Sequence, residues 1–299
     1  MPKERFSNIE ENIEEKGLLD IRPDNPKTEV PVLLAHAWGC TNEVYKPAIR
    51  TLSESGRRVM SLDHPRIGGD INKRASREVL EKYPNEEVRK AYDILDLLNR
   101  KGIEKTDVVA HSEAAINIAI AATLHPEKFR NIVFYGPAGL IGEDTFTRLL
   151  KGFAGQSKRA ESLKATPAAE KTSGFSEIPI TETEKMVAAA AAKEAIKYFA
   201  KNPVRAAKEA WGISKSQIHE MLRYLHEKGI GIVVMAAVDD PVFQMEQMQK
   251  IAKTDMLDGF LSVRGGHGEI GNHPELYMAA AEKMLTALEE KKKKERNEP

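Results

Sequence analysis

Residues 106–124 read TDVVAHSEAAINIAIAATL and predict a buried strand that leads directly into a helix. We place the strand at Thr106 to Ala110 and the helix at Ala114 to Leu124, with Ser112 on the corner between them. A serine on a tight strand-to-helix turn, with small residues two positions to either side, presents its hydroxyl for nucleophilic attack. The N–H groups at the start of the helix favour negative charge at the same point. The stretch therefore predicts acyl-transfer chemistry at Ser112, with a plain helix N-cap as the alternative.

Short apolar runs alternate with longer amphipathic ones along most of the chain, a pattern typical of a mostly parallel sheet with helices on both faces. The predicted strands are Val30 to Ala37, Arg58 to Asp63, Thr106 to Ala110, Asn131 to Tyr135, Gly231 to Val238 and Gly259 to Val263. The predicted helices are Glu43 to Ser55, Glu86 to Lys101, Ala114 to Leu124, Gln244 to Lys253 and Pro274 to Glu290. The predicted fold class is therefore α/β.

Residues 142–228 interrupt this alternation because they contain no convincing strand. Their later part predicts helices at Pro203 to Trp211 and Ser216 to Lys228. A segment of this length is too long for a structureless loop in a compact domain. We therefore expect residues 1–141 and 229–299 to form the core, and residues 142–228 to form an inserted helical lid that shields a site on the sheet from water. Helices that merely extend the core are the alternative.

A turn built on small residues, His36-Ala37-Trp38-Gly39-Cys40, follows the first predicted strand. A backbone N–H in such a turn can point over the edge of the sheet and stabilise a developing oxyanion. We expect this donor to be the N–H of Trp38, acting together with the N–H of Glu113 beside the serine. The alternative is structural: Gly39 permits a tight turn and Trp38 packs against the core.

An acid and a histidine follow the last two predicted strands. Asp239 and Asp240 come directly before Pro241, which ends the strand and leaves a carboxylate at the carboxyl end of the sheet, where the sites of α/β proteins gather. We favour Asp240 as the functional acid, with Asp239 as its rival. His267 lies in a glycine-rich loop, which suits a base that turns between an aspartate and a serine.

Ser112, Asp240 and His267 each lie at the end of a predicted strand. In the sequence the serine comes first, the acid second and the histidine last, which is one of the known chain orders of a catalytic triad. The chain resembles the α/β-hydrolase superfamily over nearly its whole length. The motifs that carry the resemblance are LLAHAWGC (Leu33 to Cys40), SLDHPRIGG (Ser61 to Gly69), VVAHSEA (Val108 to Ala114), DDPVF (Asp239 to Phe243) and GGHG (Gly265 to Gly268). Alanines stand where the family pattern has glycines, at Ala37, Ala110 and Ala114.

The resemblance implies an α/β-hydrolase fold with a helical cap domain formed by residues 142–228. It implies a catalytic triad of Ser112 as nucleophile, His267 as base and Asp240 as acid, with an oxyanion hole made by the N–H groups of Trp38 and Glu113. The predicted function is that of a carboxylesterase-like serine hydrolase, which cleaves an ester of a small molecule through an acyl-enzyme. The alternatives are a non-hydrolytic enzyme of the same fold, of the haloperoxidase or lyase type, and a catalytically weak ligand-binding member.

Composition bounds the partners and the compartment. Lys+Arg 45 balances Asp+Glu 45, so there is no overall basic field to attract nucleic acid or a membrane. One cysteine, Cys40, excludes an internal disulfide and fits a reducing compartment. The N-terminal segment is charged throughout and no stretch reaches membrane-spanning length, so we expect a soluble cytoplasmic protein. The sequence does not determine the oligomeric state, and a homodimer is compatible with it.

Residues 266–271, GHGEIG, formally match the G-x-G-x-x-G pattern of dinucleotide-binding loops. No strand is predicted after the helix that follows, so no βαβ unit can form around this motif and we expect no nucleotide cofactor. The histidines outside the proposed triad show no metal-ligand spacing, so we also expect no metal.

Overall fold

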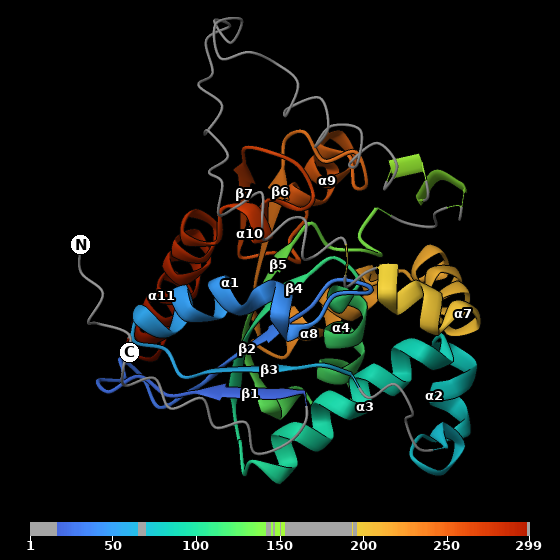
Figure 1. Cartoon of the computed structure of the whole chain (residues 1–299). Coiled ribbons are helices and arrows are strands. Elements are labelled where there is room, and N and C mark those ends of the chain that lie inside the picture. Colours follow the sequence, from blue (N-terminus) through green and yellow to red (C-terminus); the bar gives the residue numbers. More distant parts are fainter. Residues whose placement is uncertain are drawn as a thin grey trace, which may run out of the picture.

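The computed structural model describes residues 17–64, 70–141, 145, 147–149, 151, 152, 193 and 196–297. These residues form a seven-stranded sheet with helices on both faces (Figure 1). The strands are β1 (Leu18–Ile21), β2 (Val32–Ala35), β3 (Val59–Leu62), β4 (Thr106–His111), β5 (Phe129–Tyr135), β6 (Gly231–Ala237) and β7 (Gly259–Val263). They lie in the order β1-β3-β2-β4-β5-β6-β7. The β1–β3 pair is antiparallel and the other pairs are parallel, so the predicted α/β class with a mostly parallel sheet is confirmed.

Helices follow most of the strands. They are α1 (Asn42–Glu54), α2 (Arg77–Lys82), α3 (Asn85–Arg100), α4 (Ala114–Leu124), α7 (Pro203–Lys215), α8 (His219–Glu227), α9 (Met245–Ala252), α10 (Glu269–Asn272) and α11 (Pro274–Asn297). Two short 3-10 helices, Ile71–Lys73 and Pro126–Lys128, complete the described elements. Because β2, β4, β5, β6 and β7 run parallel, their carboxyl ends meet at one edge of the sheet, where the predicted site residues lie.

Every strand and helix predicted for the core is present, with small differences at the ends. The first predicted strand, Val30 to Ala37, is reduced to β2 because Pro31 has no N–H to donate to a neighbouring strand. The carbonyl of Pro31 instead accepts the N–H of Asp107 at 2.9 Å. Strand β1 is absent from the predictions, since four residues between polar stretches are too short to show a periodic pattern.

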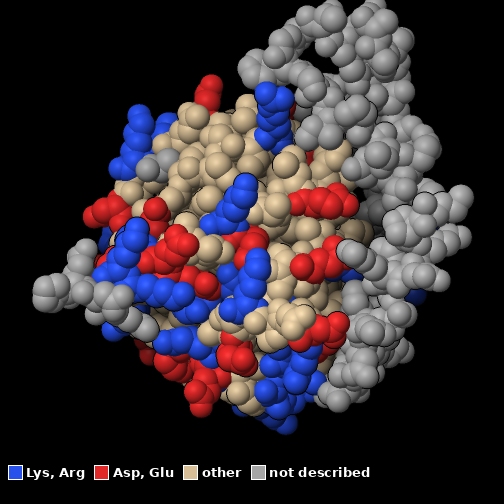
Figure 2. Space-filling view, turned by 90° about the vertical axis from the view of Figure 1, so that its left-hand side faces the viewer, with Lys and Arg blue, Asp and Glu red and all other residues tan. Residues whose placement is uncertain are grey.

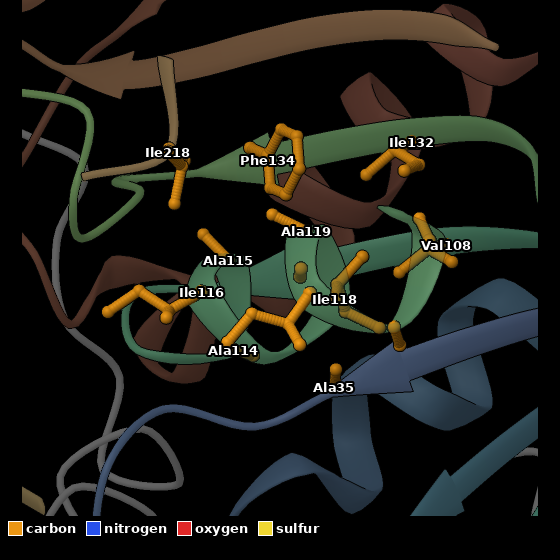
Figure 3. Close-up of a cluster of buried hydrophobic side chains, with 14 of the residues drawn as sticks. Ala35, Val108, Ala114, Ala115, Ile116, Ile118, Ala119, Ile132, Phe134 and Ile218 are labelled. Carbon is orange, nitrogen blue, oxygen red and sulfur yellow. The ribbon is translucent and has the colours of Figure 1, made fainter. Parts of the chain in front are cut away.

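The core consists of two apolar layers, one on each face of the sheet. Side chains alternate along each strand. Val108 and Ala110 of β4 therefore pack under α3, α4 and α8, whereas Val109 packs under α1 and α11. Helix α4 lies deepest, with every residue from Ala114 to Ala122 buried. Figure 3 shows alanines and isoleucines of α4 packed against Ile132 and Phe134 of β5. The small side chains let α4 approach the sheet closely behind Ser112.

Between β5 and β6, the described residues that form regular structure are helical. They include residues 196–200 and the helices α7 and α8, where Pro203 to Trp211 and Ser216 to Lys228 were expected. Helix α7 packs against α3, and α8 packs against α4 (Figure 1). Residues 153–192, the middle of the expected cap, lie outside the described part of the chain.

The surface carries charges of both signs. On the face in Figure 2, Lys and Arg side chains are interspersed with Asp and Glu rather than gathered in one basic patch. Of the helices in the described part, none combines the length and the apolar character that a bilayer crossing requires. The described residues also contain no cluster of His, Cys, Asp and Glu suited to a metal ion.

Candidate active site

Ser112 occupies a strained corner between β4 and α4. Its φ is 57°, in the left-handed region, and no other non-glycine residue in the described ranges has a positive φ. Such a conformation costs about 1–3 kcal/mol and persists only where the surroundings hold it. Here the N–H of Ser112 donates to the carbonyl of Tyr135 at 3.0 Å, and its carbonyl accepts the N–H of Ala138 at 3.1 Å. Ser112 therefore lies on a sharp turn from strand to helix, at the place where the sequence predicts one.

The alanines at positions 110 and 114 are compatible with this corner. Neither has a positive φ, so the backbone does not require glycine at either position. Ala110 is the second-last residue of β4 and Ala114 is the first residue of α4, and both methyl groups are buried in the same core cluster. The departure from the glycine pattern leaves the turn intact.

His267 joins Ser112 to Asp240 through both of its ring nitrogens. Its Nε2 lies 2.8 Å from Ser112 Oγ, and its Nδ1 lies 2.7 Å from Asp240 Oδ2. All three side chains are buried. A carboxylate only accepts hydrogen bonds, so Nδ1 carries the proton and Nε2 accepts the Ser112 hydroxyl. The structure thus brings together three residues from widely separated parts of the chain in one hydrogen-bonded series.

Asp240 is held in place by the backbone that follows it. Its second oxygen, Oδ1, accepts the N–H of Val242 at 2.7 Å and the N–H of Phe243 at 3.0 Å. The neighbouring Asp239 has an exposed side chain, and its N–H donates to the carbonyl of Gly265 at 3.0 Å. Asp240 is therefore the aspartate in contact with His267, while the backbone of Asp239 ties the acid loop to the histidine loop.

Three side chains hold the carbonyls of the loop that carries His267. The hydroxyl of Tyr277 donates to the carbonyl of Arg264, and the hydroxyl of Tyr135 donates to that of Gly266 at 2.9 Å. His111 Nε2 lies 3.0 Å from the carbonyl of His267 itself. The carbonyl of Gly265 accepts the N–H of Asp239, so each carbonyl from Arg264 to His267 has a hydrogen-bond partner, and Gly265, with a φ of 94°, forms the turn.

A buried hydrogen-bonded series runs behind the site from the turn after β2 to the histidine loop. Because a carbonyl only accepts, His111 Nε2 must carry the proton that bonds to His267, and His111 Nδ1 then accepts from the Tyr45 hydroxyl at 2.5 Å. The Tyr45 oxygen in turn accepts the N–H of Ala37 at 3.2 Å. Burial lowers the pKa of His111 well below its usual value, so the ring stays neutral and this arrangement is fixed.

Gly136 makes room for the imidazole and the carboxylate. A Cβ at this position would lie 3.1 Å from His267 Nδ1 and 3.3 Å from Asp240 Oδ2, and the φ of Gly136 is 49°. A side chain there would press on the hydrogen bond between the two. Neither Gly136 nor the pair Tyr45 and His111 was predicted from the sequence, since their roles depend on contacts between distant segments.

The two predicted oxyanion donors lie on segments next to Ser112. One follows β2, which pairs with β4 in the sheet, and the other follows Ser112 in the sequence. Trp38 lies in the turn after β2, where Gly39 has a φ of 72° and the N–H of Cys40 donates to the carbonyl of Ala37 at 3.0 Å. Glu113 directly precedes α4, so its N–H belongs to the positive end of that helix. The Glu113 side chain is buried, and its Oε1 lies 2.6 Å from Lys90 Nζ.

Comparison with known proteins gives a family and several similar structures. A model of the alpha/beta hydrolase fold family matches residues 30–268. The chain is similar to a carboxylesterase of the thaumarchaeon Nitrososphaera gargenis, with 16% identity, a TM-score of 0.60, and 92% of this chain and 95% of that chain covered. It is also similar to a bromoperoxidase from Bacillus anthracis, with 15% identity, a TM-score of 0.58 and coverages of 91% and 97%.

An enol-lactonase from Burkholderia xenovorans is similar to the same extent, with 15% identity, a TM-score of 0.58 and coverages of 90% and 96%. Among curated proteins, no significant sequence match is found. Identities this low show a common fold and leave the reaction open. With the family model matching most of its length, the chain belongs to the alpha/beta hydrolase fold family.

Proposed function

We propose that the protein is a serine hydrolase that cleaves a carboxylic ester, or a related acyl bond, of a small molecule. The observation that carries the proposal is the series Ser112 Oγ to His267 Nε2 at 2.8 Å and His267 Nδ1 to Asp240 Oδ2 at 2.7 Å. The positive φ of Ser112 supports the same assignment, because strain of this kind gathers at functional sites. The similarity to a carboxylesterase and an enol-lactonase is consistent with acyl chemistry.

In the first half of the reaction, Ser112 Oγ attacks the carbonyl carbon of the ester. The hydroxyl proton passes to Nε2 of His267, and Asp240 stabilises the resulting imidazolium through Nδ1. The tetrahedral intermediate then collapses as His267 returns the proton to the leaving alcohol. An acyl group remains on Ser112.

In the second half, a water molecule attacks the acyl carbon while His267 accepts one of its protons. Collapse of the second tetrahedral intermediate returns that proton to Ser112 Oγ and releases the carboxylic acid. In both halves the N–H groups of Trp38 and Glu113 stabilise the oxyanion. One such donor contributes about 2.7–4 kcal/mol to transition-state stabilisation in related reactions.

The test is the hydrolysis of short p-nitrophenyl esters by the parent protein and by Ser112→Ala. We expect the variant to lose several orders of magnitude in kcat. Ser55→Ala is the matched control, because Ser55 at the end of α1 hydrogen-bonds only locally, to the carbonyl of Leu52 at 2.6 Å. Parent-like hydrolysis by Ser112→Ala would disprove the proposal.

The similarity to a bromoperoxidase favours one second candidate, a non-hydrolytic reaction that uses the same three residues. Two measurements separate these candidates: the turnover of esters and lactones, and the formation of peracid from a carboxylic acid and hydrogen peroxide. Turnover of esters that depends on Ser112 supports the hydrolase, whereas Ser112-dependent peracid formation without ester turnover supports the second candidate. A folded protein that turns over neither class would be a ligand-binding member of the family.

A further inference from the structure

A cluster of four titratable residues lies buried behind the nucleophile and has no part in the proton transfers described above. It comprises Glu87 and Lys90 of α3, Glu113 beside Ser112, and Glu209 of α7, and none of the four exceeds 4% exposure. Lys90 Nζ lies 2.6 Å from Glu113 Oε1 and 3.2 Å from Glu209 Oε1. One ammonium group therefore joins the residue after the nucleophile to a helix of the inserted segment.

The groups of this cluster shift one another's pKa values. Burial opposes the charge on Lys90, but Glu113 and Glu209 outweigh it and raise the pKa of the ammonium, so Lys90 stays protonated. Burial raises the pKa of Glu87 well above its usual value, so its carboxyl stays neutral. Arg205 Nε, 3.1 Å from Glu209 Oε1, supplies the second cation. Burial also raises the pKa of Glu113, against the attraction of Lys90.

Glu209 also contacts the other predicted oxyanion donor. Its Oε2 accepts the indole N–H of Trp38 at 3.0 Å and the hydroxyl of Tyr198 at 2.5 Å. The ring of Trp38 packs on that of Phe199, with 4.8 Å between centroids. The series Trp38, Glu209, Lys90, Glu113 therefore links the side chains of both residues whose N–H groups would hold the oxyanion.

A buried ion cluster is weak support for stability, because taking charges out of water offsets most of their attraction. What such a cluster does provide is a fixed position for the groups that it joins. An oxyanion hole works only if both N–H groups point at the position that the oxyanion will occupy, and a small misplacement weakens it strongly. Anchoring each donor residue through its side chain restrains the backbone that carries the N–H.

We propose that Glu209 and Lys90 are positioning residues that hold Trp38 and Glu113 in register, so that α7 of the inserted segment completes the oxyanion hole. The proposal rests on the serine hydrolase function proposed above. Glu209 and Lys90 touch no reacting atom and act through the two donors. Their loss is therefore expected to affect kcat more than KM.

The experiment compares Glu209→Leu, Glu209→Gln and Trp38→Phe in p-nitrophenyl ester hydrolysis. Glu209→Leu removes the acceptor of the indole N–H but leaves Lys90 paired with Glu113. We expect kcat to fall at least tenfold with KM within twofold of the parent. Glu209→Gln keeps an oxygen acceptor for the indole and should recover most of the lost kcat. Trp38→Phe keeps the backbone N–H but removes the indole donor, and should reproduce the loss.

Two further measurements keep the test decisive. The double variant Trp38→Phe/Glu209→Leu should lose no more than Glu209→Leu alone, because the indole hydrogen bond is already absent in that single variant. Asp20→Asn is the matched control: Asp20 is a buried carboxylate paired with Arg58 at 2.9 and 2.8 Å on the remote strand β1, and its loss should leave kcat unchanged. If Glu209→Leu does not fold, Trp38→Phe tests the same contact from the other side.

The outcomes separate this inference from the proposed function. Parent-like kcat in both Trp38→Phe and Glu209→Leu, while Ser112→Ala is inactive, would overturn the positioning role and leave the hydrolase intact. Fully additive losses in the double variant would also overturn it. Retained activity in Ser112→Ala would instead overturn the proposed function, and the positioning role with it.

Discussion

In the proposed mechanism, the carboxylate of Asp240 stabilises the protonated His267. With Asn at this position the contact with Nδ1 survives but the ring is held in the wrong tautomer, an exchange that lowers kcat about 10⁴-fold in serine proteases. We predict a loss of similar size for Asp240→Asn in ester hydrolysis. Asp239→Asn is the matched control, because its exposed side chain is replaced while its N–H to Gly265 remains. Equal losses in the two variants would contradict the assignment.

Tyr45 supplies the proton that His111 Nδ1 accepts in the buried series behind the site. Tyr45→Phe leaves that buried nitrogen, and the N–H of the partly buried Ala37, without this partner. An unsatisfied buried polar group costs about 1–3 kcal/mol. We expect the free energy of unfolding in urea to fall by about this amount. An unchanged free energy of unfolding would show that the short contact contributes nothing to stability.

At the scale of elements, Glu87 lies on α3, which packs against α4 and α7, and it makes the free energy of unfolding depend on pH. The carboxyl of Glu87 is neutral in the folded chain, whereas in the unfolded chain it ionises above its ordinary pKa of 4.5. Unfolding therefore releases a proton between pH 4.5 and the raised pKa, and the stabilising contribution of Glu87 declines as pH rises through that window. Glutamine resembles the neutral carboxyl in shape and does not ionise.

We predict that the free energy of unfolding of Glu87→Gln rises relative to that of the parent as pH increases. The difference in the free energy of unfolding should grow by about 1.4 kcal/mol per pH unit above pH 4.5, until the raised pKa is reached. Urea unfolding of both proteins at pH 5, 6 and 7 measures this slope. A difference that does not change with pH would mean that Glu87 is ionised in the folded chain.

The sequence predicted every strand except β1 and pointed to the candidate residues, because each of these rests on a local signal. Buried runs predict strands such as β4 and β6, and Pro241 and the glycines around His267 mark the loops at their ends. The supporting contacts have no such signal. His111 and the carbonyl of His267 are 156 positions apart, and Trp38 and Glu209 are 171 apart. Only the folded arrangement of the strands and α7 brings them together.

Across the whole molecule, Arg57 joins the C-terminal helix to the sheet. The side chain is 1% exposed, and its Nη1 lies 2.6 Å from Glu289 and 3.6 Å from Asp107. Its Nε lies 2.8 Å from Glu282. These contacts are at the opposite ends of the strands from Ser112, since Asp107 stands near the beginning of β4.

Arg57→Met therefore separates stability from catalysis. The variant removes the most buried cation from three carboxylates, although Asp107 and Glu289 keep Arg130 and Glu282 keeps Lys27. Removal of one partner from a buried ion pair costs about 3–5 kcal/mol. We predict a loss of this order in chemical unfolding, with kcat of the folded variant unchanged. A stability loss below about 1 kcal/mol would show that Arg130, 2.5 Å from both Asp107 and Glu289, takes over the role of Arg57.

The most direct test of the central claim is covalent labelling with a fluorophosphonate, followed by mass spectrometry of the digested protein. An activated serine displaces fluoride from phosphorus and keeps the phosphonyl group on its oxygen. The account predicts a single adduct on Ser112, abolished in Ser112→Ala and strongly slowed in His267→Ala. A folded parent protein that acquires no adduct, or acquires it on another residue, would contradict it.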